Sequence, residues 1–104
     1  MADVKVCAVA DLPPGEARVV TLRDKEVAVF NVAGSFHAMD NLCPHRGAPL
    51  SDGRLEGKTV ICPWHGWQFD VTTGALVVSP DSRQTTYPVT VRDGHVYVAP
   101  RGNA

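Results

Sequence analysis

Two short segments of this chain each combine a cysteine with a histidine, and they constrain its fold more than any other feature. The first segment is Cys43-Pro44-His45-Arg46-Gly47, and the second is Cys62-Pro63-Trp64-His65-Gly66-Trp67. Sixteen residues separate His45 from Cys62. Thiolates and imidazoles are ligands that transition metals prefer. The pattern therefore predicts a metal site that ties two loops together, with Cys43, His45, Cys62 and His65 as its ligands.

The size and charge of the chain exclude several classes of protein. With 104 residues it has the length of one domain, and we expect a single domain over residues 1–104. The formal net charge of −1 gives no basic field that would attract nucleic acid. The first residues lack the pattern of a targeting signal, and no apolar run approaches the roughly 20 residues that span a bilayer. We therefore expect a cytoplasmic protein that binds neither nucleic acid nor a membrane.

The three cysteines of the chain do not form a disulfide framework. Two of them belong to the paired segments, which leaves Cys7 without a cysteine partner. Cys7 lies among apolar residues of a predicted strand. We therefore expect it to be a small buried core residue without a redox role.

Short β-rich segments separated by turn residues dominate the chain, and helical periodicity is weak. Strands are expected at Val4–Val9, Arg18–Leu22, Glu26–Val32, Ser35–Asp40, Lys58–Cys62, Trp67–Val71, Thr85–Arg92 and His95–Ala99. The Asp93-Gly94 pair predicts a type I′ hairpin, and Pro88 predicts that its strand lies at a sheet edge or is bulged. Residues 41–57 are expected to be mostly loop, and residues 79–81 a turn. The pattern predicts an all-β fold, a sandwich or barrel of small antiparallel sheets.

Over nearly its whole length the sequence resembles the bacterial Rieske-type ferredoxins. The resemblance is carried by Asp11–Gly15, Val27–Val32, Cys43–Gly53, Cys62–Gly74 and Tyr87-Pro88-Val89 leading to Asp93-Gly94. It implies a small domain of three antiparallel sheets with a cluster-binding tip formed by two loops. It also implies one [2Fe–2S] cluster per chain, with Cys43 and Cys62 on one iron and His45 and His65 on the other.

A departure at two positions places the chain within that family. Rieske proteins of the cytochrome bc type carry one further cysteine in each ligand loop, and these two cysteines form a disulfide. Ala48 and Trp64 stand at the matching positions of this sequence. The resemblance therefore implies a cluster site without a disulfide, in agreement with a reducing cytoplasm.

A structural zinc site is the alternative for the same four residues, because zinc accepts two thiolates and two imidazoles. The Cys-x-His spacing of the first segment is not the usual zinc-finger pair. The residues around the ligands are also much more specific for the iron–sulfur interpretation. A zinc module would be colourless and would contain no acid-labile sulfide.

A one-electron cluster in a domain without a second chemical site indicates an electron carrier and not an enzyme. We predict no catalytic residue, since the sequence contains no Ser/His/Asp grouping, phosphate loop or mononuclear-iron triad. The resemblance implies a ferredoxin that carries an electron from an NAD(P)H-dependent flavoprotein reductase to a terminal, ring-hydroxylating oxygenase. The alternative function is that of the small subunit of an assimilatory NAD(P)H nitrite reductase, with the large subunit of that enzyme as partner.

Overall fold

Strands dominate the computed structural model, which describes residues 3–22, 25–42, 49–63 and 66–99. The strands are β1 (Val4–Ala8), β2 (Ala17–Leu22), β3 (Lys25–Val32), β4 (Ser35–Asp40), β5 (Arg54–Glu56), β6 (Thr59–Ile61), β7 (Gln68–Asp70), β8 (Ala75–Leu76), β9 (Ser79–Arg83), β10 (Thr86–Tyr87), β11 (Val89–Arg92) and β12 (His95–Val98). Two short 3₁₀ helices, η1 (Val9–Asp11) and η2 (Leu50–Asp52), accompany them. No helix within the described ranges has the length and apolar character needed to cross a membrane.

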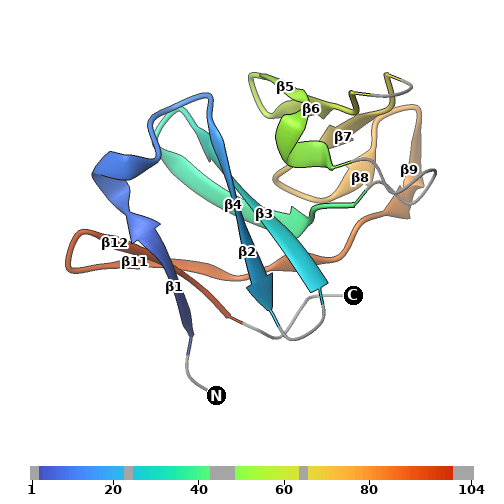
Figure 1. Ribbon diagram of the computed structural model, residues 1–104. Helices are drawn as coiled ribbons and strands as arrows, with labels where there is room; N and C mark the ends of the chain where they lie inside the picture. The colour runs from blue at the N-terminus through green and yellow to red at the C-terminus, as the bar shows by residue number, and fades with distance from the viewer. Residues whose placement is uncertain (1–2, 23–24, 43–48, 64–65, 100–104) are drawn as a thin grey trace.

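Antiparallel pairing joins the strands into three sheets, which confirms the predicted all-β fold. The first sheet has the order β1-β12-β11, the middle sheet β10-β4-β3-β2 and the third sheet β5-β6-β7-β8-β9. Figure 1 shows the strands of the middle sheet between the other two groups, with β1, β11 and β12 on one side and β5 to β9 on the other. The middle sheet therefore has a neighbour on each face.

Strand β3 supplies side chains to both faces of the middle sheet, because successive residues of a strand point in opposite directions. Val27 and Val29 pack in a core with the first sheet, whereas Ala28 and Phe30 pack in a second core with the third sheet. The first core comprises Cys7, Leu12, Leu22, Val27, Val29, Ala38, Tyr87, Val96 and Val98. The second core comprises Ala28, Phe30, Met39, Leu50, Val60, Cys62, Phe69, Val71 and Leu76. The expectation that Cys7 is a buried core residue is confirmed.

The turn between β11 and β12 has the predicted geometry. Asp93 and Gly94 have φ values of 52° and 76°, and a type I′ turn needs a positive φ at both of its central residues. Arg92 pairs with His95 across this turn. The hairpin therefore follows directly from its two turn residues.

The strand predicted over residues 85–92 is in fact two strands, β10 and β11, separated by Pro88. Pro88 has no N–H to donate to a ladder, and at this point the chain passes from the middle sheet to the first sheet. Both strands lie at the edge of their sheet, so the predicted edge position is confirmed. The sequence did not predict that the two strands belong to different sheets. A proline indicates where a strand is interrupted, but it does not indicate which sheet the following residues join.

Two predictions of irregular structure were wrong. Residues 54–56, expected to be part of a loop, form β5, and residues 79–81, expected to be a turn, belong to β9. Each strand is defined by its neighbour, since β5 pairs with β6 and β9 pairs with β8. In β5 only Leu55 is partly buried, so no alternating apolar pattern marks it in the sequence.

Candidate metal centre

Cys62 is the predicted ligand that lies in the described part of the chain. It follows β6 directly, its side chain is buried in the second core, and its thiol is free. The other three predicted ligands, Cys43, His45 and His65, lie outside the described residues. The structure describes residues on either side of the undescribed parts of both segments.

The ends of the first segment are held together at its base. Leu42 forms an isolated antiparallel bridge with Pro49, and the Leu50 amide donates to the Asn41 carbonyl at 2.6 Å. The segment that contains Cys43 and His45 therefore begins and ends at neighbouring points of the structure.

The returning end of the first segment lies against the residue that precedes Cys62. Arg54 is the first residue of β5 and pairs with Ile61, the last residue of β6. Gly53 and Cys62 therefore lie at the same end of this strand pair. A Cβ atom added to Gly53 would lie 2.1 Å from the Ile61 carbonyl oxygen, a distance that real Cβ atoms do not adopt. Gly53 thus permits a close contact between the chain that follows the first segment and the residue that precedes the second.

Two backbone hydrogen bonds join the ends of the second segment. The Cys62 amide donates to the Trp67 carbonyl at 2.7 Å, and the Gly66 amide donates to the Cys62 carbonyl at 3.1 Å. The Trp67 ring lies 6.5 Å from the ring of buried Phe69, tilted by 43°. Backbone hydrogen bonds and core packing therefore fix the position of Cys62 on the third sheet.

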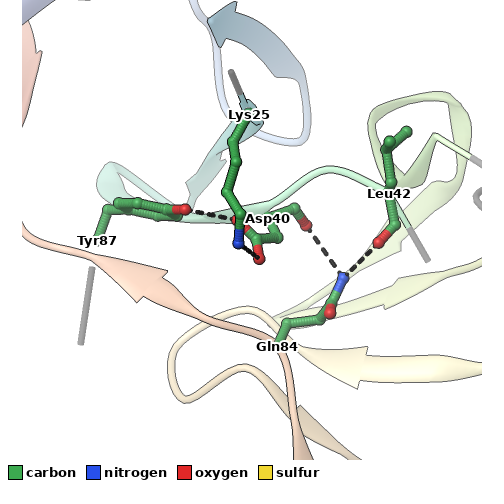
Figure 2. Close-up of polar contacts among 5 residues, drawn as sticks. All are labelled: Lys25, Asp40, Leu42, Gln84 and Tyr87. Atoms are coloured by element: carbon green, nitrogen blue, oxygen red, sulfur yellow. Dashed lines mark hydrogen bonds and ion pairs between the residues drawn. The ribbon is translucent and has the colours of Figure 1, made fainter. Parts of the chain in front are cut away.

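A polar network stabilises the chain just before the first segment, as Figure 2 shows. The Asp40 carboxylate accepts a hydrogen bond from the Tyr87 hydroxyl at 2.5 Å and pairs with the Lys25 Nζ at 3.3 Å. The buried Gln84 amide donates from Nε2 to the Asp40 carbonyl at 3.3 Å and to the Leu42 carbonyl at 2.8 Å. Residues from two other parts of the chain thus fix the end of β4.

Two buried groups have pKa values displaced by their surroundings. Burial raises the pKa of the Tyr87 hydroxyl well above its usual range, and the hydrogen bond to Asp40 and its negative charge raise it further. The hydroxyl therefore remains a donor throughout the neutral range. Burial also raises the pKa of the Cys7 thiol, an effect that nearby Arg18 opposes. Cys7 thus stays a neutral thiol in the first core.

Sequence reasoning did not identify Asn41 and Gln84 as residues of this region. Asn41 immediately precedes the first segment, and its position next to a ligand motif was a usable signal. Gln84 lies 42 residues beyond Leu42, the carbonyl of which it binds. No feature of the sequence around Gln84 indicates that contact, because sheet topology alone creates it.

The donor set of the two segments fits a [2Fe–2S] cluster of the Rieske type. Such a cluster takes two thiolates on one iron and two imidazoles on the other. Cys62, the described member of this set, is 2% exposed and lies in the second core. It directly follows Ile61, the carbonyl of which lies against Gly53.

Comparison with known proteins agrees with this interpretation. The sequence profile of the Rieske [2Fe-2S] domain matches residues 2–93. The ferredoxin component of the naphthalene 1,2-dioxygenase system of Pseudomonas putida is 38% identical over 96 residues, which cover 91% of this chain and 92% of the relative. The 3-phenylpropionate/cinnamic acid dioxygenase ferredoxin subunit of Escherichia coli O139:H28 is 42% identical over 98 residues, 91% of each chain.

A solved structure has the same fold over almost the whole chain. It is the complex of reduced oxygenase and oxidized ferredoxin in carbazole 1,9a-dioxygenase. One chain of that complex matches with a TM-score of 0.91 and 38% sequence identity, and the match covers 98% of this chain and 96% of that chain. The similarity therefore extends to the arrangement of the three sheets and is not confined to the ligand motifs.

Proposed function

Because the chain belongs to the Rieske [2Fe–2S] domain family, we propose that it is the ferredoxin of a ring-hydroxylating dioxygenase system. In that role it takes one electron from an NAD(P)H-dependent flavoprotein reductase and passes it to a terminal oxygenase. The chain itself is a carrier and not an enzyme. The observation that carries this proposal is the sequence similarity to dioxygenase ferredoxins, which extends over nearly the full length of this chain and of each relative.

We propose that Cys43 and Cys62 hold one iron of the cluster and that His45 and His65 hold the other, within a single domain over residues 1–104. When bound, the cluster supplies a one-electron couple. The contact between Gly53 and Ile61 and the buried position of Cys62 support this ligand set. Gly53 follows the first segment, and Ile61 immediately precedes the second.

The contribution of the protein is to hold the ligand loops on a rigid support. The third sheet packs on the middle sheet through the second core, which includes Cys62 and Leu50. Leu50 lies directly beyond the first segment, so one core anchors both loops. An electron carrier benefits from such a support, because ligands that are already in position need little rearrangement when the charge changes.

The relatives reported above belong to dioxygenase systems, which favours the oxygenase over the nitrite reductase as the electron acceptor. We place the protein in the cytoplasm. The thiol of Cys7, which forms no disulfide, is consistent with that compartment.

A spectroscopic experiment tests the proposal. Protein isolated anaerobically and reduced with dithionite should give the EPR spectrum of a Rieske cluster, with iron and acid-labile sulfide in equal amounts. The Cys62→Ser variant should lose this signal. The Cys7→Ser variant is the matched control, since Cys7 is also a buried free cysteine but lies in the first core. It should keep the signal.

Other results would contradict the proposal. Colourless protein that contains zinc and no sulfide would indicate the structural zinc module. Co-purification from the native host with a sirohaem-containing large subunit, in place of a flavoprotein reductase and an oxygenase, would indicate the nitrite reductase subunit.

A further inference from the structure

Asn41 is a buried residue with all of its polar groups engaged at the base of the first ligand loop, which we define as residues 42–49. It is 1% exposed. Its backbone amide donates to the Glu26 carbonyl at 2.8 Å, and its carbonyl accepts from the Leu50 amide at 2.6 Å. Its side-chain Nδ2 donates to Glu26 Oε1 at 2.9 Å, and its Oδ1 accepts from the Ser51 amide at 2.8 Å. Asn41 therefore joins the residues on either side of the first ligand loop to each other and to β3.

The chemistry of these contacts suits asparagine. The side chain accepts a hydrogen bond on one side and donates one on the other, and the amide of asparagine supplies a separate acceptor and donor for these two contacts. Glu26 fixes the orientation of that amide, because its carboxylate accepts hydrogen bonds and cannot donate them when ionised. Nδ2 therefore faces Glu26, and Oδ1 is directed at Ser51.

The same contacts connect the first loop to the core that contains Cys62. Leu50, held by the Asn41 carbonyl, is fully buried in the second core together with Cys62. Ser51, held by the Asn41 side chain, is the next residue in η2. A change at Asn41 would therefore alter the placement of one loop relative to the other, and not only the first loop itself.

We propose that Asn41 is a positioning residue for the iron–sulfur cluster. It holds Leu50 and Ser51, which follow the first ligand loop, next to the start of that loop, and it thereby influences the midpoint potential, the EPR spectrum and the retention of the cluster. The inference rests on the proposed function, since it requires a cluster held by the proposed ligands. Groups that orient metal ligands commonly have a large effect on metal affinity.

Asn31, a residue of β3, provides a control. It is also buried, its Nδ2 donates to the Leu12 carbonyl at 2.7 Å, and its Oδ1 accepts from the Gly34 amide at 2.8 Å. Its contacts have the same chemistry as those of the Asn41 side chain. They lie at the opposite end of β3 from Glu26, next to the turn that leads into β4.

The experiment compares Asn41→Ala with Asn31→Ala in the cluster-loaded protein. Both variants should lower the unfolding temperature. Asn41→Ala alone should shift the midpoint potential and the EPR g values, and it should release iron to a chelator about 10-fold faster than the wild type. An Asn41→Asp, Glu26→Gln double variant exchanges donor and acceptor at the same net charge, and it should restore the spectrum and the potential.

The inference would be overturned if Asn41→Ala lost thermal stability but kept the wild-type potential, g values and rate of iron release. If Asn41→Ala does not fold, Asn41→Asp is used for the test. The Asn41→Asp variant should have an altered EPR spectrum and midpoint potential, and the added Glu26→Gln substitution should reverse both changes. The absence of this reversal would also overturn the inference. Wild-type protein without any Rieske signal would instead refute the proposed function, so the two failures are distinguishable.

Discussion

Asp40 shows how a single residue at the end of a strand can organise its surroundings. Its carboxylate binds the Tyr87 hydroxyl and Lys25, and its carbonyl accepts from Gln84. The Lys25 side chain is largely exposed, so its ion pair contributes little stability. The buried Tyr87 is the stronger partner, because a neutral donor bound to a carboxylate forms a charge-assisted hydrogen bond.

The Tyr87→Phe substitution should therefore lower the free energy of unfolding by about 1.5–3 kcal/mol at neutral pH, the usual contribution of a hydrogen bond to a charged group. The matched control is Tyr97→Phe, which keeps the ring that lies 4.2 Å from the Arg92 guanidinium carbon. That variant should change stability by no more than about 0.5 kcal/mol. Denaturant unfolding at pH 8 measures both values. Equal stability of wild type and Tyr87→Phe would contradict the role of the hydroxyl.

The pH dependence of the same hydrogen bond has a definite sign. The pKa of Tyr87 is raised in the folded protein, so folding favours the protonated hydroxyl. The stabilisation is complete below the ordinary tyrosine pKa of about 10 and decreases as the pH rises from there towards the raised pKa. The difference in stability between wild type and Tyr87→Phe should therefore become smaller at alkaline pH. A difference that grew with pH would contradict this assignment.

At the scale of elements, the pairing of β5 with β6 determines where the two ligand segments meet. Arg54 pairs with Ile61, and the Gly53 that precedes β5 lies against the Ile61 carbonyl. Gly53 has a φ of −77°, so its requirement for glycine arises from this close approach and not from its backbone conformation. A side chain here would separate the returning first segment from Cys62.

The Gly53→Ala substitution should accordingly destabilise the protein by about 1–3 kcal/mol, because one of the two backbones must move. It should also alter the absorption and EPR spectra of the cluster. Gly57→Ala is the control: its added Cβ would meet no atom within 4 Å, and its cost comes from a φ of +59°. That variant should lose stability without a spectral change. If both variants left the spectra unchanged, the Gly53 contact would have no bearing on the cluster.

In the molecule as a whole, the middle sheet contributes side chains to two hydrophobic cores, one on each of its faces. Met39 and Ala38 are neighbours on β4, yet Met39 packs towards the third sheet and Ala38 towards the first. Within the described ranges, Cys62 and Leu50 connect the candidate metal centre to the second of these cores. The first sheet is consequently a support that lies on the far face of the middle sheet.

Removal of the cluster should therefore affect the two sides of the molecule unequally. After iron is extracted by a chelator, amide hydrogen exchange should become faster in β5 to β9, while β1, β2, β11 and β12 keep most of their protection. Regions with fewer stabilising constraints open more often, and exchange reports such local opening. Hydrogen exchange followed by mass spectrometry provides the measurement. An equal loss of protection in the first and third sheets would argue against this division.

The sequence by itself determined the chemistry and the class of fold. Four ligand residues at their spacing predict a metal centre, and the Asp93-Gly94 pair predicts a hairpin, because local backbone and donor chemistry are encoded in neighbouring residues. The burial of Cys7 also followed from its apolar neighbours.

Only the tertiary structure decided which distant residues meet. The strands β5 and β9 exist because adjacent strands offer them partners, and Gln84 reaches Leu42 because the sheets bring together residues that lie 42 positions apart. Likewise, the closure of the first loop by Asn41 depends on Ser51 and Glu26, which come from different parts of the chain. The physical reason is that such contacts depend on the path of the backbone through three sheets, and no local pattern of residues records that path.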